Sequence, residues 1–187
     1  MEYCESLKTE LSAQQFDGQP VQVMIDDRDL RGGEKTWHHI KRGVPIRAEV
    51  GPRDVASGSV FMGRRDQGPK EKRGVPRDEF VANIGKELQE IQDGLFARAA
   101  ELRKANTHNI DSLDEFKKFF TPKNADQPEI HAGFAMCHWA EDPEVLKILK
   151  ELKVTIRCIP TDGPEEEGTC IFTGKPSKKR VVFAKAY

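Results

Sequence analysis

The sequence predicts an α/β protein built from two small layered units. Helix-like and strand-like segments alternate along its 187 residues, first in the order α-β-α-β-β-β-α and then as α-β-α-β-β-β. A chain of this length forms one domain or two small ones. The polar break at 106–112 directly follows a long helical pattern, so we expect an N-terminal unit over 1–108 and a C-terminal unit over 109–187.

Local patterns define the start of the first unit. Apolar residues recur at three- and four-residue steps in 2–16, which predicts an amphipathic helix, and the apolar run 21–25 predicts a buried strand. The glycine-rich segment 26–33 is expected to be a loop at the C-terminal end of that strand. A short helix over 34–42 follows, and the alternation in 44–50 predicts a strand that is apolar on one face.

The rest of the first unit reads as a turn, a hairpin and a helix. Glycine and proline mark the turn at 51–54, and the DQGP sequence marks the tip of a hairpin over 57–76. A long helix is expected from Arg77 to about Lys104, because its apolar residues keep the helical spacing throughout.

The second unit repeats the alternation in shorter elements. Its expected helices begin at Ser112, a capping residue, and at Pro143, a residue favoured in the first helical turn. All its expected elements are, in chain order, a helix at 113–120, a strand at 130–139, a helix at 143–152, a strand at 154–160, an acidic loop at 161–169 and a closing hairpin at 170–187.

The composition excludes several classes of protein. No stretch approaches the roughly 20 apolar residues that cross a bilayer. The N-terminus is acidic and lacks the apolar region of a signal peptide. We therefore expect a cytoplasmic protein with no membrane contact, whose four cysteines are reduced.

Positive charge is concentrated in one part of the chain. The formal net charge is −1, but residues 28–77 hold thirteen Lys and Arg against six Asp and Glu. Such a distribution is typical of a surface that faces a polyanion. A solvated charged face explains the composition about equally well.

The residues favour binding over catalysis. Asp26, Asp27 and Asp29 could bind Mg²⁺ at the end of the first strand, but arginines interrupt them and a loop-fixing role is at least as probable. His38 and His39 point about 100° apart on a helix and cannot chelate one ion together.

Arginine and an aromatic side chain lie together in the basic part. Arg47 is expected to point outward from its strand, and Trp37 lies on the neighbouring basic helix. Single-stranded RNA is bound by such side chains through stacking and base-edge contacts. Two alternatives remain open: Trp37 is a partly buried anchor of its helix, and Arg47 pairs with Glu49 or Asp54.

The motif KRGVPIRAEVGPRD at 41–54 resembles the anticodon-binding domain of prolyl-tRNA synthetases. The preceding DDRD loop, the RRD-x-G sequence at 64–68 and the FAKAY ending also fit, the last resembling eukaryotic and archaeal-type enzymes. The resemblance covers nearly the whole chain. It implies a mixed-sheet, class IIa anticodon-binding domain followed by a small α/β C-terminal domain.

The resemblance also implies which residues contact RNA. Arg47 and Arg53 match the basic anticodon contacts of the family, and Lys70 matches a third more loosely. We assign Lys35 and Arg31 to phosphates. Thr36 and Ile40 replace a phenylalanine and a glutamate of many relatives, so the roles of those two positions do not transfer.

A zinc site found in many relatives is degenerate in this chain. Its four cysteine positions correspond to Ala140, Val145, Cys170 and Thr173, and one thiolate cannot hold Zn²⁺. We therefore expect no zinc. The resemblance also implies that the Tyr187 carboxylate reaches towards the active site of the parent enzyme.

The implied parent enzyme joins L-proline to tRNA(Pro) with ATP and Mg²⁺, as a homodimer. No segment of this chain resembles its class II catalytic core or the first strand of the family's anticodon-binding domain. We therefore expect the chain to be inactive alone, and its own catalytic domain to be a partner. The alternatives are a free-standing RNA-binding accessory protein of the same fold and a protein-interaction module that binds no RNA.

Overall fold

The computed structural model describes residues 1–124 and 133–186. The chain divides into two compact units, Met1–Arg98 and Ala99–Tyr187, which are described separately below. The α/β fold class is confirmed in both. Among the described residues, no helix is both long enough and apolar enough to cross a membrane.

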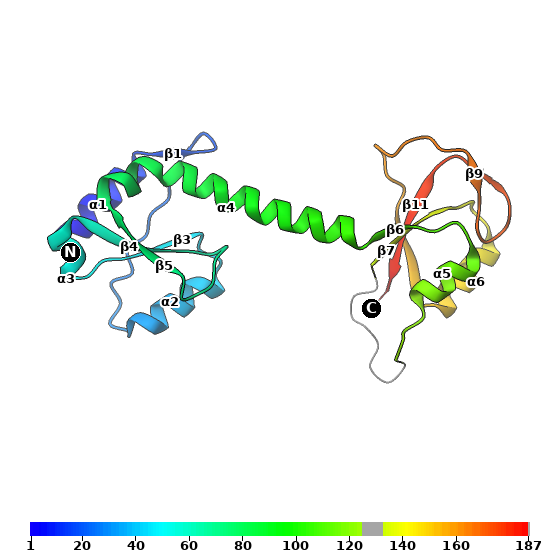
Figure 1. The fold of residues 1–187 in the computed structure, drawn as a ribbon, viewed down its shortest axis with the longest axis horizontal. Helices are drawn as coiled ribbons and strands as arrows, with labels where there is room; N and C mark the ends of the chain where they lie inside the picture. The colour runs from blue at the N-terminus through cyan, green and yellow to red at the C-terminus, as the bar shows by residue number, and fades with distance from the viewer. Residues whose placement is uncertain (125–132, 187) are drawn as a thin grey trace. The chain divides into compact units, whose positions relative to one another are not determined.

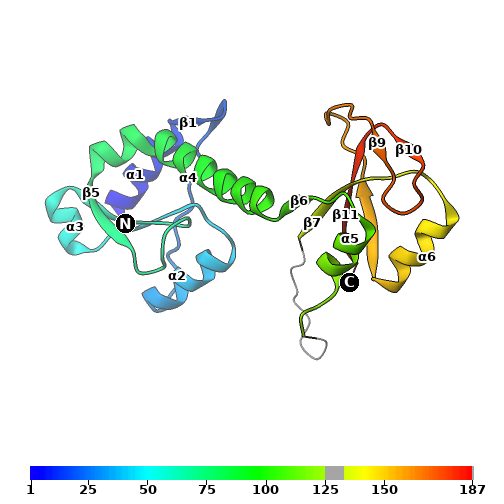
Figure 2. The same cartoon turned by 45° about the vertical axis from the view of Figure 1, so that its right-hand side comes forward.

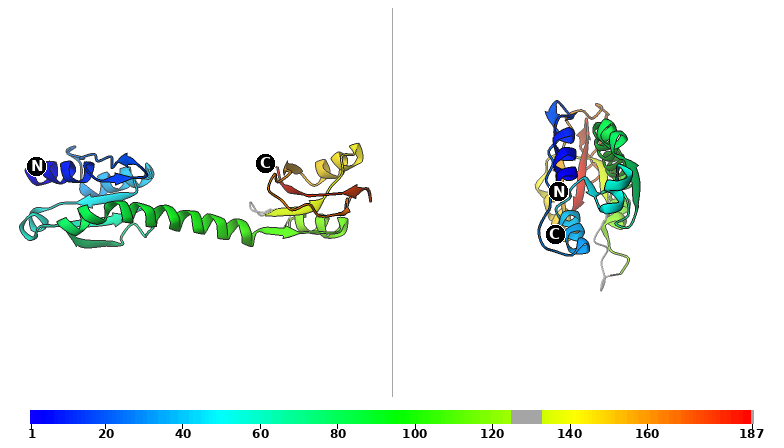
Figure 3. Two further views of the ribbon diagram at one scale, coloured as in Figure 1. Left: turned by 90° about the horizontal axis from the view of Figure 1, so that it is seen from above. Right: turned by 90° about the vertical axis from the view of Figure 1, so that its left-hand side faces the viewer.

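A three-stranded antiparallel sheet forms the centre of unit 1. Its strand order is β3 (Ile46–Glu49), β4 (Ser59–Arg64) and β5 (Lys72–Pro76), so β3 and β5 are edge strands. The hairpin of β4 and β5 confirms the prediction over 57–76. Helices α1 (Glu2–Ser12) and α4 (Arg77–Ala105) lie on one side of the sheet, and α2 (Gly32–Lys41) lies on the other (Figures 1 and 3).

The core of unit 1 lies on the side of α1 and α4. Alternate residues of β4 point into it because successive strand side chains face opposite ways. The buried members are Leu7, Leu11, Val60, Met62, Phe80 and Ile84. Arg64 continues the same face, where it is bonded bidentately to Asp66 and reaches Glu87 on α4 at 2.7 Å.

The predicted strand at 21–25 is wrong. A short hairpin of β1 (Gln15–Phe16) and β2 (Gln19–Pro20) shortens the predicted first helix, and residues 21–28 belong to no strand. Val21, Val23 and Ile25 are nevertheless half-buried while Gln22 and Met24 are exposed. This alternation is that of an extended segment, but no neighbouring strand pairs with it.

The predicted turn at 51–54 is also incomplete, because it opens a helix. Helix α3 (Pro52–Ser57) has Pro52 in its first turn, and the Asp54 carboxylate accepts the Gly51 N–H at 2.8 Å. Proline and an acidic residue in the first turn both favour a helix start.

Unit 2 is built on a mixed four-stranded sheet. Its strand order is β6 (Thr107–Asn109), β7 (Phe134–His138), β11 (Arg180–Lys185) and β8 (Val154–Cys158). Only β6 and β7 are parallel, and β6 lies within the segment expected to be a break. Helices α5 (Leu113–Phe120) and α6 (Pro143–Glu151) begin where predicted, after Ser112 and at Pro143, and Asp142 is the cap of α6.

The predicted closing hairpin at 170–187 is wrong. Its second half is β11, which lies between β7 and β8 in the main sheet. Its first half contributes β10 (Pro176–Ser177), which pairs with β9 (Gly168–Thr169) from the expected acidic loop (Figure 2). Phenylalanines from α5 and β11 form the centre of the core around Phe116.

Candidate nucleic-acid interface

The face of the β3–β4–β5 sheet that is turned away from the core carries charged and aromatic residues. The strand register places its members in two rows of three across the sheet. We call this set the polar sheet face: Arg47, Gly63 and Lys72 in one row, and Glu49, Phe61 and Gly74 in the other.

Arg47 lies deep in this face. The residue is only 8% exposed, and its Nε and Nη1 atoms are buried without a hydrogen-bond partner. A side-chain Cβ at Gly63 would lie 3.2 Å from Arg47 Nη2, so the glycine makes room for the guanidinium. Arg47 therefore lies on the outward face of its strand, as expected, but its side chain is buried there.

Neither of the acids proposed as partners of Arg47 pairs with it. Glu49 instead accepts a hydrogen bond from Thr36 Oγ1 at 3.1 Å and forms an ion pair with Lys72. Asp54 accepts the Gly51 N–H. Unpaired N–H groups cost free energy while they are buried. An acceptor that reached Nε or Nη1 of Arg47 would remove part of this cost. The contact between Thr36 and Glu49 also holds α2 beside the polar sheet face.

Asp26 fixes the loop that leads into α2. Its carboxylate accepts hydrogen bonds from Arg28 at 2.7 and 2.8 Å and contacts His39 Nε2 at 2.7 Å, while its carbonyl accepts one from Lys35 Nζ at 3.0 Å. The hydrogen bonds from Arg28 hold the pKa of Asp26 well below its usual value, although partial burial opposes this. These contacts agree with the loop-fixing interpretation of the acidic segment.

The other predicted RNA-binding residues are spread around the polar sheet face. Arg53 is exposed on α3, Arg31 is exposed at the start of α2, and Lys70 is exposed in the turn between β4 and β5. Lys35 is half-buried, and its ammonium group is engaged by the Asp26 carbonyl. Trp37 is 57% exposed and belongs to neither core cluster, which argues against its being a partly buried anchor.

Sequence reasoning counted Lys72 among the basic residues of 28–77 without assigning it an RNA contact, and it missed Phe61. Lys72 lies in the same row as Arg47, whereas Lys70 lies outside the strand. Phe61 is 40% exposed in the central strand. Alternation along the predicted hairpin could have revealed that residues 61 and 63 share a face, but only the pairing with β3 places Arg47 on it.

Two of the four degenerate zinc positions, Val145 and Cys170, are buried, and the other two, Ala140 and Thr173, are half-buried. Val145 is completely buried in the core of unit 2, and Cys170 is 2% exposed. Burial raises the pKa of the Cys170 thiol, but hydrogen bonds from the Thr173 hydroxyl and from nearby backbone N–H groups outweigh it and leave that pKa below its usual value. In the described ranges, no three His, Cys, Asp or Glu side chains are grouped to hold a metal ion.

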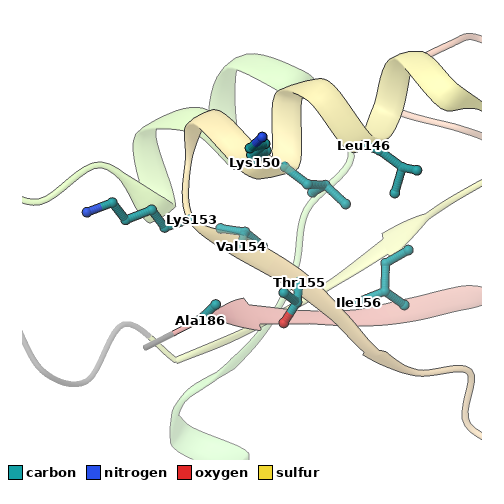
Figure 4. Close-up of a pocket in the computed structure, with 8 residues that line it drawn as sticks. Leu146, Lys150, Lys153, Val154, Thr155, Ile156 and Ala186 are labelled. Carbon is teal, nitrogen blue, oxygen red and sulfur yellow. The ribbon is translucent and has the colours of Figure 1, made fainter.

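A separate apolar pocket lies in unit 2. It has a volume of about 530 Å³ and opens between α6 and β8 (Figure 4). Its lining is Leu146, Leu149, Lys150, Lys153, Val154, Thr155, Ile156 and Ala186. This set contains no carboxylate, imidazole or thiol, and its titratable side chains are those of Lys150 and Lys153. Tyr187, whose carboxylate was expected near an active site, is outside the described residues.

Two family models match the chain. Residues 1–87 match the anticodon binding domain, and residues 127–187 match the C-terminal domain of prolyl-tRNA synthetase. The second match includes the degenerate zinc positions.

Curated relatives agree with these matches. The chain is 54% identical to proline–tRNA ligase 2 of Anaeromyxobacter dehalogenans and 52% identical to proline–tRNA ligase of Rhodopirellula baltica. These alignments cover 99% and 100% of the chain, but only 37% and 36% of the two relatives. The chain thus spans a little over a third of their length.

A solved structure has the same fold. Prolyl-tRNA synthetase from Cryptosporidium parvum, complexed with L-proline and AMP, superposes with a TM-score of 0.77 at 29% sequence identity. The superposition covers 100% of this chain and 37% of that one. The chain therefore belongs to the prolyl-tRNA synthetase family, of which it comprises the anticodon-binding and C-terminal domains.

Proposed function

We propose that the polar sheet face recognises the anticodon of tRNA(Pro). The observation that carries the proposal is the buried guanidinium of Arg47, whose Nε and Nη1 have no acceptor. Proline anticodons share two guanines. An arginine donates two parallel hydrogen bonds to guanine O6 and N7, which distinguishes guanine from the other bases. A guanine edge that bonds Nη2 and either Nε or Nη1 would supply an acceptor that Arg47 lacks.

The surrounding cations have different tasks. Arg53 contacts a base or the backbone near the two guanines, and Lys72 supports Arg47 from the same row. Arg31 and Lys70 are exposed and suited to phosphates, where they fix the position of the RNA without reading its sequence. Lys35 reaches a phosphate only by sharing its ammonium group with the Asp26 carbonyl.

The whole enzyme is proposed to ligate L-proline to tRNA(Pro), using ATP and Mg²⁺. In this proposal it is a cytoplasmic homodimer whose catalytic domain carries the chemistry and contacts the C-terminal domain. The contribution of the present chain is to select the tRNA. This division agrees with the similarity to proline–tRNA ligases of about three times its length.

A binding titration tests the proposal. The chain is titrated with tRNA(Pro) and with the same tRNA carrying an unrelated anticodon. Arg53→Ala should cost about 1–3 kcal/mol and reduce the discrimination, as expected for a residue that reads a base. Lys70→Ala should weaken both RNAs equally and reduce the salt dependence of binding.

The two variants serve as controls for each other, because each removes one exposed cation. Equal affinity of the unmodified chain for both anticodons would contradict the proposal. Normal discrimination by a correctly folded Arg53→Ala variant would remove Arg53 from the interface.

A further inference from the structure

We infer that Phe61 is a stacking platform for one unpaired base of the RNA bound at the polar sheet face. The inference rests on the proposed function and adds to it a contact that carries no charge. Phe61 lies in the central strand β4, on the same face as Arg47 and Lys72.

The surroundings of Phe61 leave its ring open. The residue is 40% exposed, and its direct neighbour on β5 is Gly74, where an added Cβ would meet no atom within 4 Å. The next residue of β4 on this face is Gly63, whose missing side chain is replaced by the Arg47 guanidinium. Phe61 is in none of the aromatic pairs found among the described side chains.

The register brings the ring close to two cations. Glu49 and Gly74 are directly opposite Phe61, so Arg47 and Lys72 are its diagonal neighbours across the two strand pairs. Diagonal neighbours in a sheet are about 7–8 Å apart at Cα, which long side chains can bridge. A base lying on the ring would thus have both cationic side chains beside it, with Lys72 paired to Glu49 and Arg47 deep in the sheet face.

Charge complementarity selects RNA as the occupant of this surface. A flat aromatic ring stacks on every base, and such platforms in single-stranded nucleic-acid sites are accompanied by positive charge. An apolar protein partner would instead leave Arg47 Nε and Nη1 without acceptors, and it would have to bury the Lys72–Glu49 ion pair. Leaving buried polar groups unpaired and removing an ion pair from water are both unfavourable.

The test uses a fluorescent stem-loop carrying the tRNA(Pro) anticodon and the whole 187-residue chain. Phe61→Leu keeps an apolar side chain but removes the ring, and we expect it to weaken binding about tenfold, within the range measured for base–aromatic stacking. Phe61→Tyr keeps the ring and should bind within about threefold of the unmodified chain. The matched control is Phe96→Leu, because Phe96 is 71% exposed on α4, outside the polar sheet face.

A second measurement separates stacking from a structural effect. Loop positions are replaced one at a time by abasic nucleotides. At one position the replacement should weaken binding to the unmodified chain and abolish the difference between that chain and Phe61→Leu. A difference that persists with every abasic loop would overturn the inference.

The possible failures are distinguishable. If Phe61→Leu binds as tightly as the unmodified chain while Arg47→Met loses discrimination, the inference is wrong and the proposed function stands. If the unmodified chain does not prefer the proline anticodon, the proposed function fails and the inference fails with it.

Discussion

Replacing Arg47 by methionine should make unit 1 more stable and at the same time remove its preference for the proline anticodon. Methionine retains an unbranched apolar stem, which can pack where the arginine methylenes lie. It lacks the two N–H-bearing atoms, Nε and Nη1, that are buried without partners in Arg47. The substitution therefore removes a cost of folding rather than a stabilising contact.

The magnitude follows from those two atoms. An unsatisfied buried donor costs about 1–3 kcal/mol. Some of this is offset because methionine fills the site less completely than arginine. We therefore expect the free energy of unfolding of unit 1 to rise by about 1–3 kcal/mol, which for a unit of this size raises its Tm by roughly 4–8 °C per kcal/mol.

Urea unfolding of the 187-residue chain measures the effect, and hydrogen exchange of β4 amides identifies the transition of unit 1. Arg53→Met is the matched control, because it makes the same chemical change at an exposed position and should leave stability unchanged within about 0.5 kcal/mol. Loss of stability in Arg47→Met would refute the reasoning, since it would mean that the guanidinium has a partner in the free protein.

Four further predictions concern the rest of the chain. Burial raises the pKa of Cys137 to about 12 from 9.0, so between these pH values the folded chain keeps a proton that the unfolded chain releases. The free energy of unfolding should therefore fall between pH 9 and 12 by up to about 1.4 kcal/mol per pH unit. Urea titrations of Cys137→Ala should not show this slope. Gly168→Ala would place a Cβ 2.3 Å from Nε2 of the buried His138, and should lower the free energy of unfolding by about 1–3 kcal/mol. Adding His138→Ala should restore part of that loss in the double variant. An unchanged unfolding midpoint in Gly168→Ala would contradict this packing. Metal analysis of the purified chain should find far less than one zinc per chain, and stoichiometric zinc lost to a chelator would refute the interpretation of the degenerate site. Amides of 22–25 should exchange faster than those of β4, because they belong to no strand, and equal protection of the two segments would show that a partner strand is present.

Sequence patterns predicted the elements whose stability is local. Helices α2, α4, α5 and α6 follow from their periodicity and their caps, and the β4–β5 hairpin follows from its turn. The start of α3 at Pro52 was also readable, because Gly51 precedes a proline and Asp54 caps the first turn.

The errors occur where pairing is not local. Residues 21–25 have the composition of a strand, but a strand forms only with a hydrogen-bonded partner, and no described strand pairs with them. The three residues of β6 carry no pattern of their own and are defined by parallel pairing with β7. The position of β11 between β7 and β8 likewise depends on contacts far apart in sequence.

The same distinction applies to the interface. The basic residues at 28–77 are visible in the sequence, and a resemblance can assign RNA contacts to some of them. The depth of Arg47, its missing partners and the row that it shares with Lys72 depend on strand register, which the sequence does not encode locally.

Because Gly63 has no side chain, the residue at position 63 determines how close the Arg47 guanidinium can lie to the sheet. A methyl group there would approach Arg47 Nη2 to 3.2 Å and Lys72 Cγ to 3.3 Å, so each larger side chain would lift both cations further from the sheet. An arginine that is raised into water has hydrated N–H groups, so the free energy of unfolding increases. The free energy gained when RNA supplies acceptors to that arginine decreases by the same reasoning. The effects of substitutions at positions 47 and 63 therefore depend on each other, and a redesign of this surface has to choose the two residues together.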